Sequence, residues 1–384
     1  MRLTIPSALV VATVGVGSVL AEGALGSSER HLAGSVQLDY LANPRGVAQP
    51  DQGLRGGTVE LTLKLTMDFG EHVSSNVKVC FACHGFELGM AFFDLRVADE
   101  LNVRVGRFTP AFGSFPLRSD PANHSTSDKP LPYDMGRMTR LREWNEGVLP
   151  APWVDNGIEV NGAHFFGKHI QLDYAAYAIG GPKGDANATD FDFKQSRSPE
   201  RYYVDNNVEP ALGGRVSVTA DIAPSTILTV GGSVMTGHYD PDARLGFTIV
   251  GGDVALQLGR TFLRAEYLIR RTEIALGDDP ASRFKYGPNT SGQFSDYTLK
   301  DGFVAEILVP VGRIEMIGRW DGLRQTGNVL ATSTLRSRSV VLRYTGGIAY
   351  RLTGALRLKT SAEVYDFSDY SDELVFHLGL AGPF

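Results

Sequence analysis

The feature that most constrains this fold is a two-residue alternation of apolar and charged side chains that recurs along almost the whole chain. Residues 59–67, for example, carry apolar side chains at odd positions and polar or charged ones at even positions, among them Glu60, Thr62 and Lys64. Such alternation is typical of β-strands whose two faces meet different surroundings. Because one face carries full charges in strand after strand, we expect a sheet with one wet and one apolar side.

Segments with this alternation occur about sixteen times. An even number of antiparallel strands can close into a barrel with both chain termini in the periplasm. They span residues 35–42, 58–69, 76–82, 87–97, 101–107, 156–166, 169–179, 213–222, 226–236, 245–258, 260–271, 299–309, 313–321, 337–352, 355–367 and 373–384. The last segment ends on the aromatic Phe384, in phase with its apolar face. The sequence therefore predicts an all-β protein, a closed antiparallel transmembrane β-barrel, rather than a soluble β-sandwich or a solenoid.

The connections between these segments are of two kinds, short and long. The short ones lie at 167–168, 223–225 and 311–312, and the long polar ones at 108–155, 180–212 and 273–298. Short periplasmic turns and long outer loops are typical of outer-membrane barrels. We therefore expect the protein in the bacterial outer membrane, in contact with its lipid.

The N-terminus has the features of a cleaved secretory signal peptide, which we assign to residues 1–21. Arg2 precedes an apolar run that ends in small residues before Glu22. After Ala21 no apolar run approaches the roughly 18 residues that a transmembrane helix needs. Without a linker or a shift in composition, residues 22–384 are expected to form one barrel. The formal net charge of −6 offers no basic surface for nucleic acid.

The chain lacks the common catalytic signatures. It contains no Gly-x-Ser-x-Gly elbow, no His-Glu-x-x-His helix and no phosphate-binding loop. We therefore expect a protein that is not an enzyme.

One stretch resembles a known family. In "LNVRVGRFTPAFGSFPLR" (residues 101–118), a strand that ends in Gly-Arg-Phe leads into a long loop after Pro110, and this is similar to the corresponding stretch of phosphate-selective-type porins. The resemblance is specific over residues 87–118 and architectural elsewhere. It implies a sixteen-stranded outer-membrane pore, assembled as a homotrimer, with a long loop folded into the lumen. It implies a channel for small hydrophilic solutes, without a solute preference.

Connection 108–155 is the candidate constriction loop. It is far longer than an ordinary connection, and loops of that length usually have a function. Its charged residues include Arg118, Lys129, Asp134, Arg137 and Arg140. Folded into the lumen, the loop would narrow the channel and impose an electric field on passing solutes. Alternatively, it forms an extracellular cap that shields the mouth of the barrel.

Strand parity also predicts the pore wall, because alternate residues of each strand face inward. The candidate wall residues are Arg104, Arg264, Arg313, Arg319, Arg357, Glu315 and Glu363. Such a mixture fits an anion path, and it equally fits paired charges that keep the wall rigid and wet. No selectivity follows from it.

Residues 78–90 contain a second motif. Cys80 and Cys83 are the only cysteines, and His84 follows directly. Cys-x-x-Cys-His is the attachment signature of c-type haem. Haem iron in cytochromes takes His/Met or His/His ligands. The motif therefore predicts His84 as the proximal ligand, and the candidates for the distal one are Met90, His124 and His72. Strand parity points Cys80 into the lumen and places the turn after it at the outer end of a hairpin.

A Cys80–Cys83 disulfide is the alternative, because two lone cysteines in an exported protein usually pair. A zinc site ranks third, since four ligands are needed and only three are local. In joining Cys80, Cys83 and His84 to a barrel, the chain resembles the fused cytochrome–porins of iron-oxidising bacteria, which carry the motif in an N-terminal plug. That resemblance implies a second function, a haem c-bearing barrel that transfers electrons across the outer membrane to or from a periplasmic redox protein.

Overall fold

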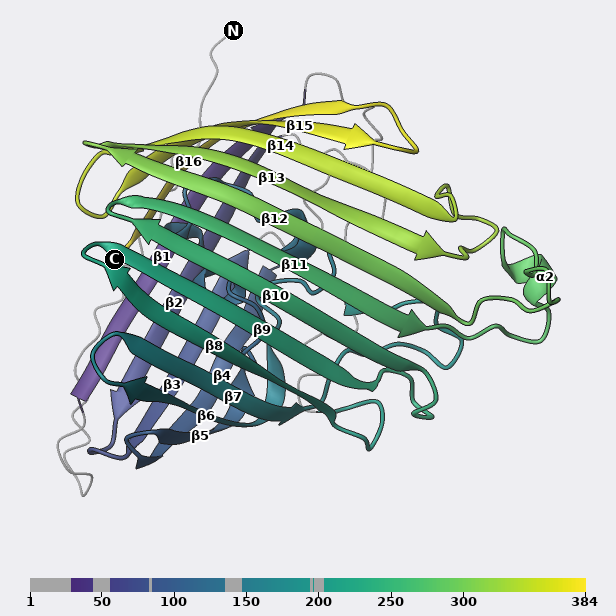
Figure 1. Cartoon of the computed structure of the whole chain (residues 1–384), viewed down its shortest axis with the longest axis horizontal. Coiled ribbons are helices and arrows are strands. Elements are labelled where there is room, and N and C mark those ends of the chain that lie inside the picture. The colour runs from purple at the N-terminus through teal and green to yellow at the C-terminus, as the bar shows by residue number, and fades with distance from the viewer. Residues whose placement is uncertain (1–28, 44–55, 83–84, 135–146, 194–195, 197–203) are drawn as a thin grey trace, which may run out of the picture.

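The computed structural model describes residues 29–43, 56–82, 85–134, 147–193, 196 and 204–384. Sixteen β-strands pair in chain order, and β1 pairs with β16, so that they form one closed antiparallel barrel, as the alternation predicts (Figure 1). The predicted signal peptide lies outside the described residues. No helix among the described residues is long and apolar enough to cross a membrane.

The wall consists of long, tilted strands. They are β1 (Glu29–Ala42), β2 (Gly56–Asp68), β3 (Val73–Ala82), β4 (Gly85–Ala98), β5 (Leu101–Phe108), β6 (Asp155–Phe166), β7 (Ile170–Ile179), β8 (Ala211–Ala223), β9 (Thr226–His238), β10 (Gly246–Leu258), β11 (Thr261–Glu273), β12 (Tyr297–Val311), β13 (Ile314–Gly327), β14 (Arg338–Arg351), β15 (Arg357–Phe367) and β16 (Glu373–Pro383). The helices whose bounds lie within the described residues are single turns in the connections: η1 (Pro116–Arg118), η2 (Pro121–Asn123), η3 (Leu131–Tyr133) and α2 (Pro280–Arg283).

Side chains alternate across the wall. In β16, Phe376 and Leu378 are exposed on the outside, whereas Val375 and His377 are buried inside. The same apolar outer face recurs around the barrel, for example at Val105 of β5. A continuous exposed apolar band on a closed barrel is stable only against lipid. The strands therefore span a membrane and contact its hydrocarbon.

The two ends of the barrel differ as predicted. At one end the turns are short, and two of them place Gly259 and Gly312 at φ +59° and +61°, where a Cβ would be strained. Both ends of the described chain lie there, since Ser35 pairs with Pro383. The opposite end carries the long connections 109–154, 180–210 and 274–296. Ala82 and Gly85 pair at the long-loop end, where the motif hairpin was expected.

Two strands, β1 and β13, extend furthest beyond the predicted bounds, and one predicted wall residue lies elsewhere. β1 begins at Glu29, where its polar N-terminal residues pair with β2. β13 continues to Gly327, although glycines, which lack a side chain to mark a face, interrupt its pattern. Arg313 lies in the turn before β13 and is exposed. It does not belong to the wall.

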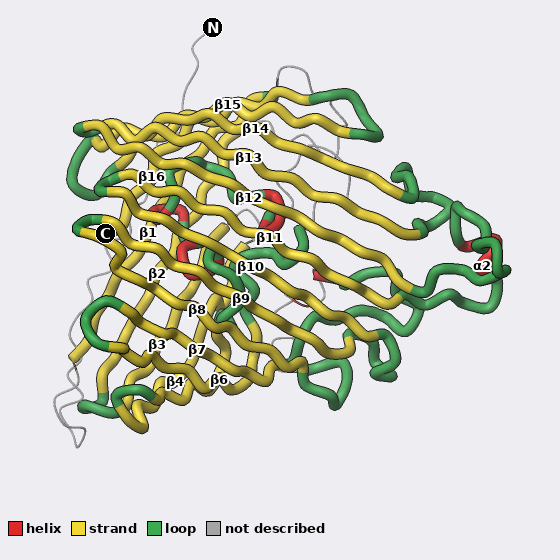
Figure 2. The backbone as a smooth tube through the Cα atoms, in the orientation of Figure 1, coloured by secondary structure: helices red, strands yellow, loops and turns green. Residues whose placement is uncertain are grey.

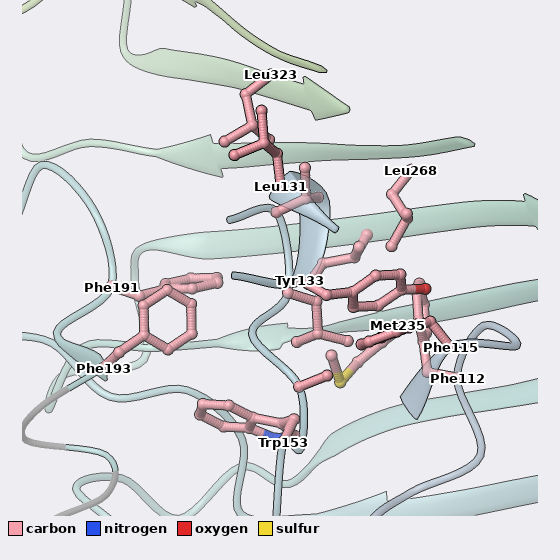
Figure 3. Close-up of a cluster of buried hydrophobic side chains, with 14 of the residues drawn as sticks. Phe112, Phe115, Leu131, Tyr133, Trp153, Phe191, Phe193, Met235, Leu268 and Leu323 are labelled. Atoms are coloured by element: carbon pink, nitrogen blue, oxygen red, sulfur yellow. The ribbon is translucent and has the colours of Figure 1, made fainter. Parts of the chain in front are cut away.

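The lumen is partly filled by an apolar core. Phe112, Phe115, Tyr133 and Trp153 of connection 109–154 are buried there against wall residues such as Leu268 (Figure 3). Figure 2 shows helical turns and loop segments within the outline of the barrel. The described part of the long loop therefore packs inside the barrel, as the resemblance implies.

Candidate functional site

The tip of connection 109–154 is anchored to β13, β14 and β15 by one arginine. Arg343 of β14 is fully buried and donates from Nη1 to Asp128 Oδ2 at 2.6 Å and from Nη2 to the Lys129 carbonyl at 2.5 Å. It also donates to both oxygens of Asp321, at 3.0 and 2.6 Å. The arginine guanidinium has five N–H donors in a rigid planar arrangement, which allows it to bind several acceptors at once. Arg343 therefore joins the loop to the wall through charge-assisted hydrogen bonds, which are the strong kind.

Neighbouring side chains repeat the attachment. Arg319 Nη1 donates to Thr126 Oγ1 and to the Asp128 carbonyl, both at 3.0 Å. Ser125 donates to Glu315 at 3.1 Å. Every residue from His124 to Asp128 is buried. This part of the loop thus fills the lumen beside β13–β15.

A second anchor lies on β11, two strands from β13 along the wall. Glu266 accepts hydrogen bonds from the Ser114 amide at 2.9 Å, the Ser114 hydroxyl at 3.1 Å and the Phe115 amide at 3.3 Å. The Tyr133 hydroxyl donates to the same carboxylate. Gly113 allows this approach, because its φ is +65° and a Cβ would lie 2.1 Å from the Tyr133 hydroxyl oxygen. The carboxylate of Glu266 therefore holds both ends of loop segment 114–133.

A third set of contacts fixes the start of the loop. Arg104 of β5 pairs with Asp94 at 2.9 Å and with Glu159 at 3.3 Å. Glu159 in turn accepts from the Ala111 amide at 2.9 Å. Lys78 of β3 pairs with Asp120 of the loop. The loop thus meets the wall on several sides and crosses the lumen between them.

Connection 180–210 also enters the lumen, which the sequence did not indicate. Asp190 accepts two hydrogen bonds of 2.8 Å from Arg270, a buried wall residue of β11. Arg270 lies over the ring of Phe191, 4.4 Å from its centroid. Phe193 packs edge-on against Trp153 of the first loop. The two long loops therefore share one core.

A polar vestibule remains open at the end with the short turns. It has a volume of about 610 Å³. Its lining comes from β2–β7 and their turns and includes Asp68, Asp94, Asn102, Asn161 and Asp173. Asn102 donates to Asp94 at 3.0 Å. Small polar groups and charges thus surround a water-accessible space below the loop.

The other predicted wall residues are inward and paired. Arg264 donates to Glu306 at 3.1 Å, and Arg357 lies 3.6 Å from Glu315. Arg319 and Glu363 are buried and lie 3.6 Å apart. Only Arg313 lies away from the wall. The arrangement favours paired charges over a row of free cations.

The predicted loop residues have different surroundings. Arg118 lies 3.7 Å from Glu306 and over the ring of Phe115. Lys129 Nζ donates to the Ala151 carbonyl at 2.8 Å. Asp134 is buried, and its carbonyl accepts from the Gly147 amide. Arg137 and Arg140 lie outside the described residues.

The haem motif is described only in part, since Cys83 and His84 lie outside the described residues. Cys80 is half-buried, faces the lumen beside Thr62, and forms no disulfide with any residue that the structure describes. Of the three distal candidates, Met90 faces inward on the adjacent strand and packs against the core. His72 lies in the turn at the far end of β3, roughly 26 Å along the strand from Cys80. It cannot bind the same iron, so the expectation for His72 is wrong.

His124, the third distal candidate, belongs to the buried part of the loop. Its Nδ1–H donates to the Thr126 carbonyl at 2.9 Å, and its ring packs near Phe115. Burial lowers the pKa of His124 well below its usual value, and the nearby cations Lys359, Lys129 and Arg319 lower it further. The imidazole is therefore neutral at neutral pH.

No family model and no curated protein sequence matches the chain. Solved structures match its fold. The outer membrane channel DcaP of Acinetobacter baumannii has a TM-score of 0.55 at 14% identity, with 93% of this chain and 97% of that one covered. A Salmonella typhi OmpF complex with daunomycin has a TM-score of 0.55 at 10% identity, covering 92% and 97%. OmpT with loop L8 deleted, an outer membrane protein of Vibrio cholerae, has 0.52 at 9%, covering 93% and 99%. At these identities the likeness shows the fold, a barrel of the bacterial outer-membrane type.

Proposed function

We propose that this protein is an outer-membrane channel, without enzymatic activity, that conducts small hydrophilic solutes. The observation that carries the proposal is a polar vestibule inside a sixteen-stranded barrel whose lumen is partly filled by anchored loops. Barrels of this strand number are wide enough to enclose an aqueous channel. The two loops reduce that width, so the solutes are small.

Further support comes from the character of the inner surface. Ion pairs such as Arg104–Asp94 and Arg264–Glu306 line it among the described residues. A wall of paired charges is wet and rigid. By analogy with the trimer form of Vibrio cholerae OmpT, we propose that three copies assemble.

Single-channel conductance in planar bilayers tests this function. Asn102 faces the vestibule, whereas Val105 of the same strand is exposed on the lipid side. We expect Asn102→Trp to reduce the conductance severalfold, because the indole occupies the path. Val105→Trp, the matched control, should leave it unchanged. A wild-type protein that folds yet conducts no ions would contradict the proposal.

A haem-bearing electron carrier is the second candidate, favoured by the Cys-x-x-Cys-His sequence and by the inward position of Cys80 next to the loop. The haem would be held by Cys80, Cys83 and His84. Of the remaining distal candidates, Met90 and His124, Met90 lies on the strand that pairs with the strand of Cys80. When bound, it would exchange one electron with a periplasmic redox protein. Intact mass after expression with haem-maturation machinery tests this. A haem-sized gain that disappears in the Cys80→Ala, Cys83→Ala variant supports it, and an unmodified mass contradicts it.

A further inference from the structure

Three buried side chains bring metal-ligating atoms together where the constriction loop meets the wall. Asp128 comes from the loop, Glu363 from β15 and His377 from β16. One ligand atom from each lies within 4.8 Å of the other two. Each of the three residues is at most 2% exposed. We name them the Asp–Glu–His cluster.

The imidazole of His377 is oriented as in a metal site. Its Nδ1 lies 2.9 Å from Asp39 Oδ2, to which an Nδ1–H donates. In the neutral imidazole the other nitrogen, Nε2, then carries a lone pair, and it faces Glu363 Oε2 at 3.8 Å. Metal-binding histidines commonly donate their second nitrogen to a carboxylate in this way. Asp39 thus fixes the tautomer that a metal ion requires.

Two of the ligand atoms lack partners. Among the described residues, no hydrogen bond reaches His377 Nε2 or Asp128 Oδ1, although both atoms are buried. An unpartnered buried polar atom is costly and calls for an explanation. The second oxygen of Asp128 is occupied by Arg343 Nη1 at 2.6 Å, and Glu363 Oε1 has only the long contact of 3.6 Å with Arg319. Asp128 Oδ1 and His377 Nε2 are therefore available to a cation.

The charges around the cluster also favour a cation. Its contacts connect four carboxylates (Asp39, Asp128, Asp321 and Glu363) with two guanidiniums (Arg319 and Arg343). Lys359 lies beside this network at Gln37. Carboxylates therefore outnumber guanidiniums around the three ligand atoms, and a bound cation would face carboxylate oxygens.

We propose that the Asp–Glu–His cluster binds one divalent transition-metal ion of the zinc class. One imidazole nitrogen and two carboxylate oxygens suit Zn²⁺, whereas Mg²⁺ and Ca²⁺ prefer oxygen ligands alone. The bound ion would link the tip of the loop to β15 and β16. A metal bound here therefore acts as a removable cross-link of the constriction loop.

Zinc titration of the purified, folded barrel tests the site, with Zn²⁺ alone as the probe and bound metal counted by elemental analysis. We expect one equivalent, bound at least tenfold more weakly in His377→Asn and in Asp128→Asn. Asn at 377 keeps a donor toward Asp39 but lacks Nε2, and Asn at 128 keeps an oxygen for Arg343. His238→Asn is the matched control, because His238 pairs with one carboxylate, Glu209, at the outer rim. It should bind as the wild type does.

A second possible zinc site is tested with its own variant. Glu29, His31 and Asp68 form an exposed trio at the other end of the barrel. If His31→Asn abolishes binding while His377→Asn retains it, or if the wild type binds no zinc, the proposal is wrong. Should His377→Asn fail to fold, the deciding measurement is cobalt-edge X-ray absorption of Co²⁺-loaded His31→Asn, which lacks the imidazole of the exposed trio. One imidazole in the first shell supports the cluster, and none or several contradict it.

Discussion

The Gly-Arg-Phe sequence at the end of β5 has a physical explanation at the level of single residues. Gly106 has a φ of +130°, and a Cβ there would lie 2.4 Å from the Ala91 carbonyl oxygen on β4. Only glycine accepts both conditions without strain. The chain can therefore bend inward after β5, and Phe108, which follows, is fully buried against Phe92.

We therefore expect Gly106→Ala to destabilise the barrel by roughly 1–3 kcal/mol, the usual range for backbone strain. The measurement is the urea midpoint of unfolding in lipid vesicles. Gly232→Ala is the control, because its Cβ would meet nothing nearer than the Gly251 carbonyl oxygen at 3.9 Å. Equal midpoints for the two variants would contradict this role of Gly106.

His124 predicts a pH dependence of loop docking. Its pKa is lowered in the folded protein, first by burial and then by Lys359, Lys129 and Arg319. The undocked loop then binds a proton at about pH 6.5, and the docked loop does so only at lower pH. Docking is fully stable above about pH 6.5, and each pH unit below it costs up to about 1.4 kcal/mol until the folded pKa is reached.

The corresponding measurement is hydrogen exchange of residues 124–134 by mass spectrometry at pH 7 and pH 5. We expect protection to fall at pH 5 in the wild type. His124→Gln cannot bind the proton, so it should lose less protection than the wild type over the same range. Identical losses in the two proteins would assign the acid effect to other groups.

At the scale of elements, the docking of connection 109–154 against the wall involves the buried Arg343. Removing one partner of a buried ion pair costs about 3–5 kcal/mol, because the remaining charges stay buried without compensation. In Arg343→Met, Asp128 and Asp321 lose their main donor. We expect the loop tip to detach and the single-channel conductance to rise. Arg324→Met is the control, since Arg324 pairs with Asp301 but is much more exposed; it should conduct as the wild type does. Unchanged conductance in Arg343→Met would exclude the loop tip as the narrowing element.

The strands were predictable from sequence because each reveals its two faces locally. All sixteen appear where the alternation predicts them, and their boundaries shift most where the pattern is weak, as in the polar start of β1 and the glycines of β13. Arg313 was misplaced because parity cannot tell the last residue of a turn from the first of a strand.

The site was predictable only in part. Parity gave the inward side chains of the wall, but not their partners in the loops. Arg343 and Asp128 are 215 residues apart in sequence, and Tyr133 and Glu266 are 133 apart. No local pattern encodes such pairs. Likewise, Asp190 of connection 180–210 meets Arg270 only in the folded barrel.

On the scale of the whole molecule, barrel and loops stabilise each other. The strands supply a closed hydrogen-bonded wall, but a wall of this size encloses more space than its own side chains fill. The two inserted loops supply the missing core, with Phe115, Tyr133 and Phe191 among its buried residues. The fold therefore combines a membrane barrel with an internal core like that of a soluble protein.

The sidedness of the molecule follows from the same architecture. Long connections of outer-membrane barrels face the cell exterior and short turns face the periplasm. Ser291 lies exposed in the long connection 274–296, and Arg313 lies exposed in a two-residue turn at the other end. In a Cys80→Ala, Cys83→Ala background, we expect a membrane-impermeant maleimide to label Ser291→Cys on intact cells. Arg313→Cys should react only after the outer membrane is permeabilised. Labelling of Arg313→Cys on intact cells, with Ser291→Cys protected, would mean that the barrel is inserted in the opposite direction.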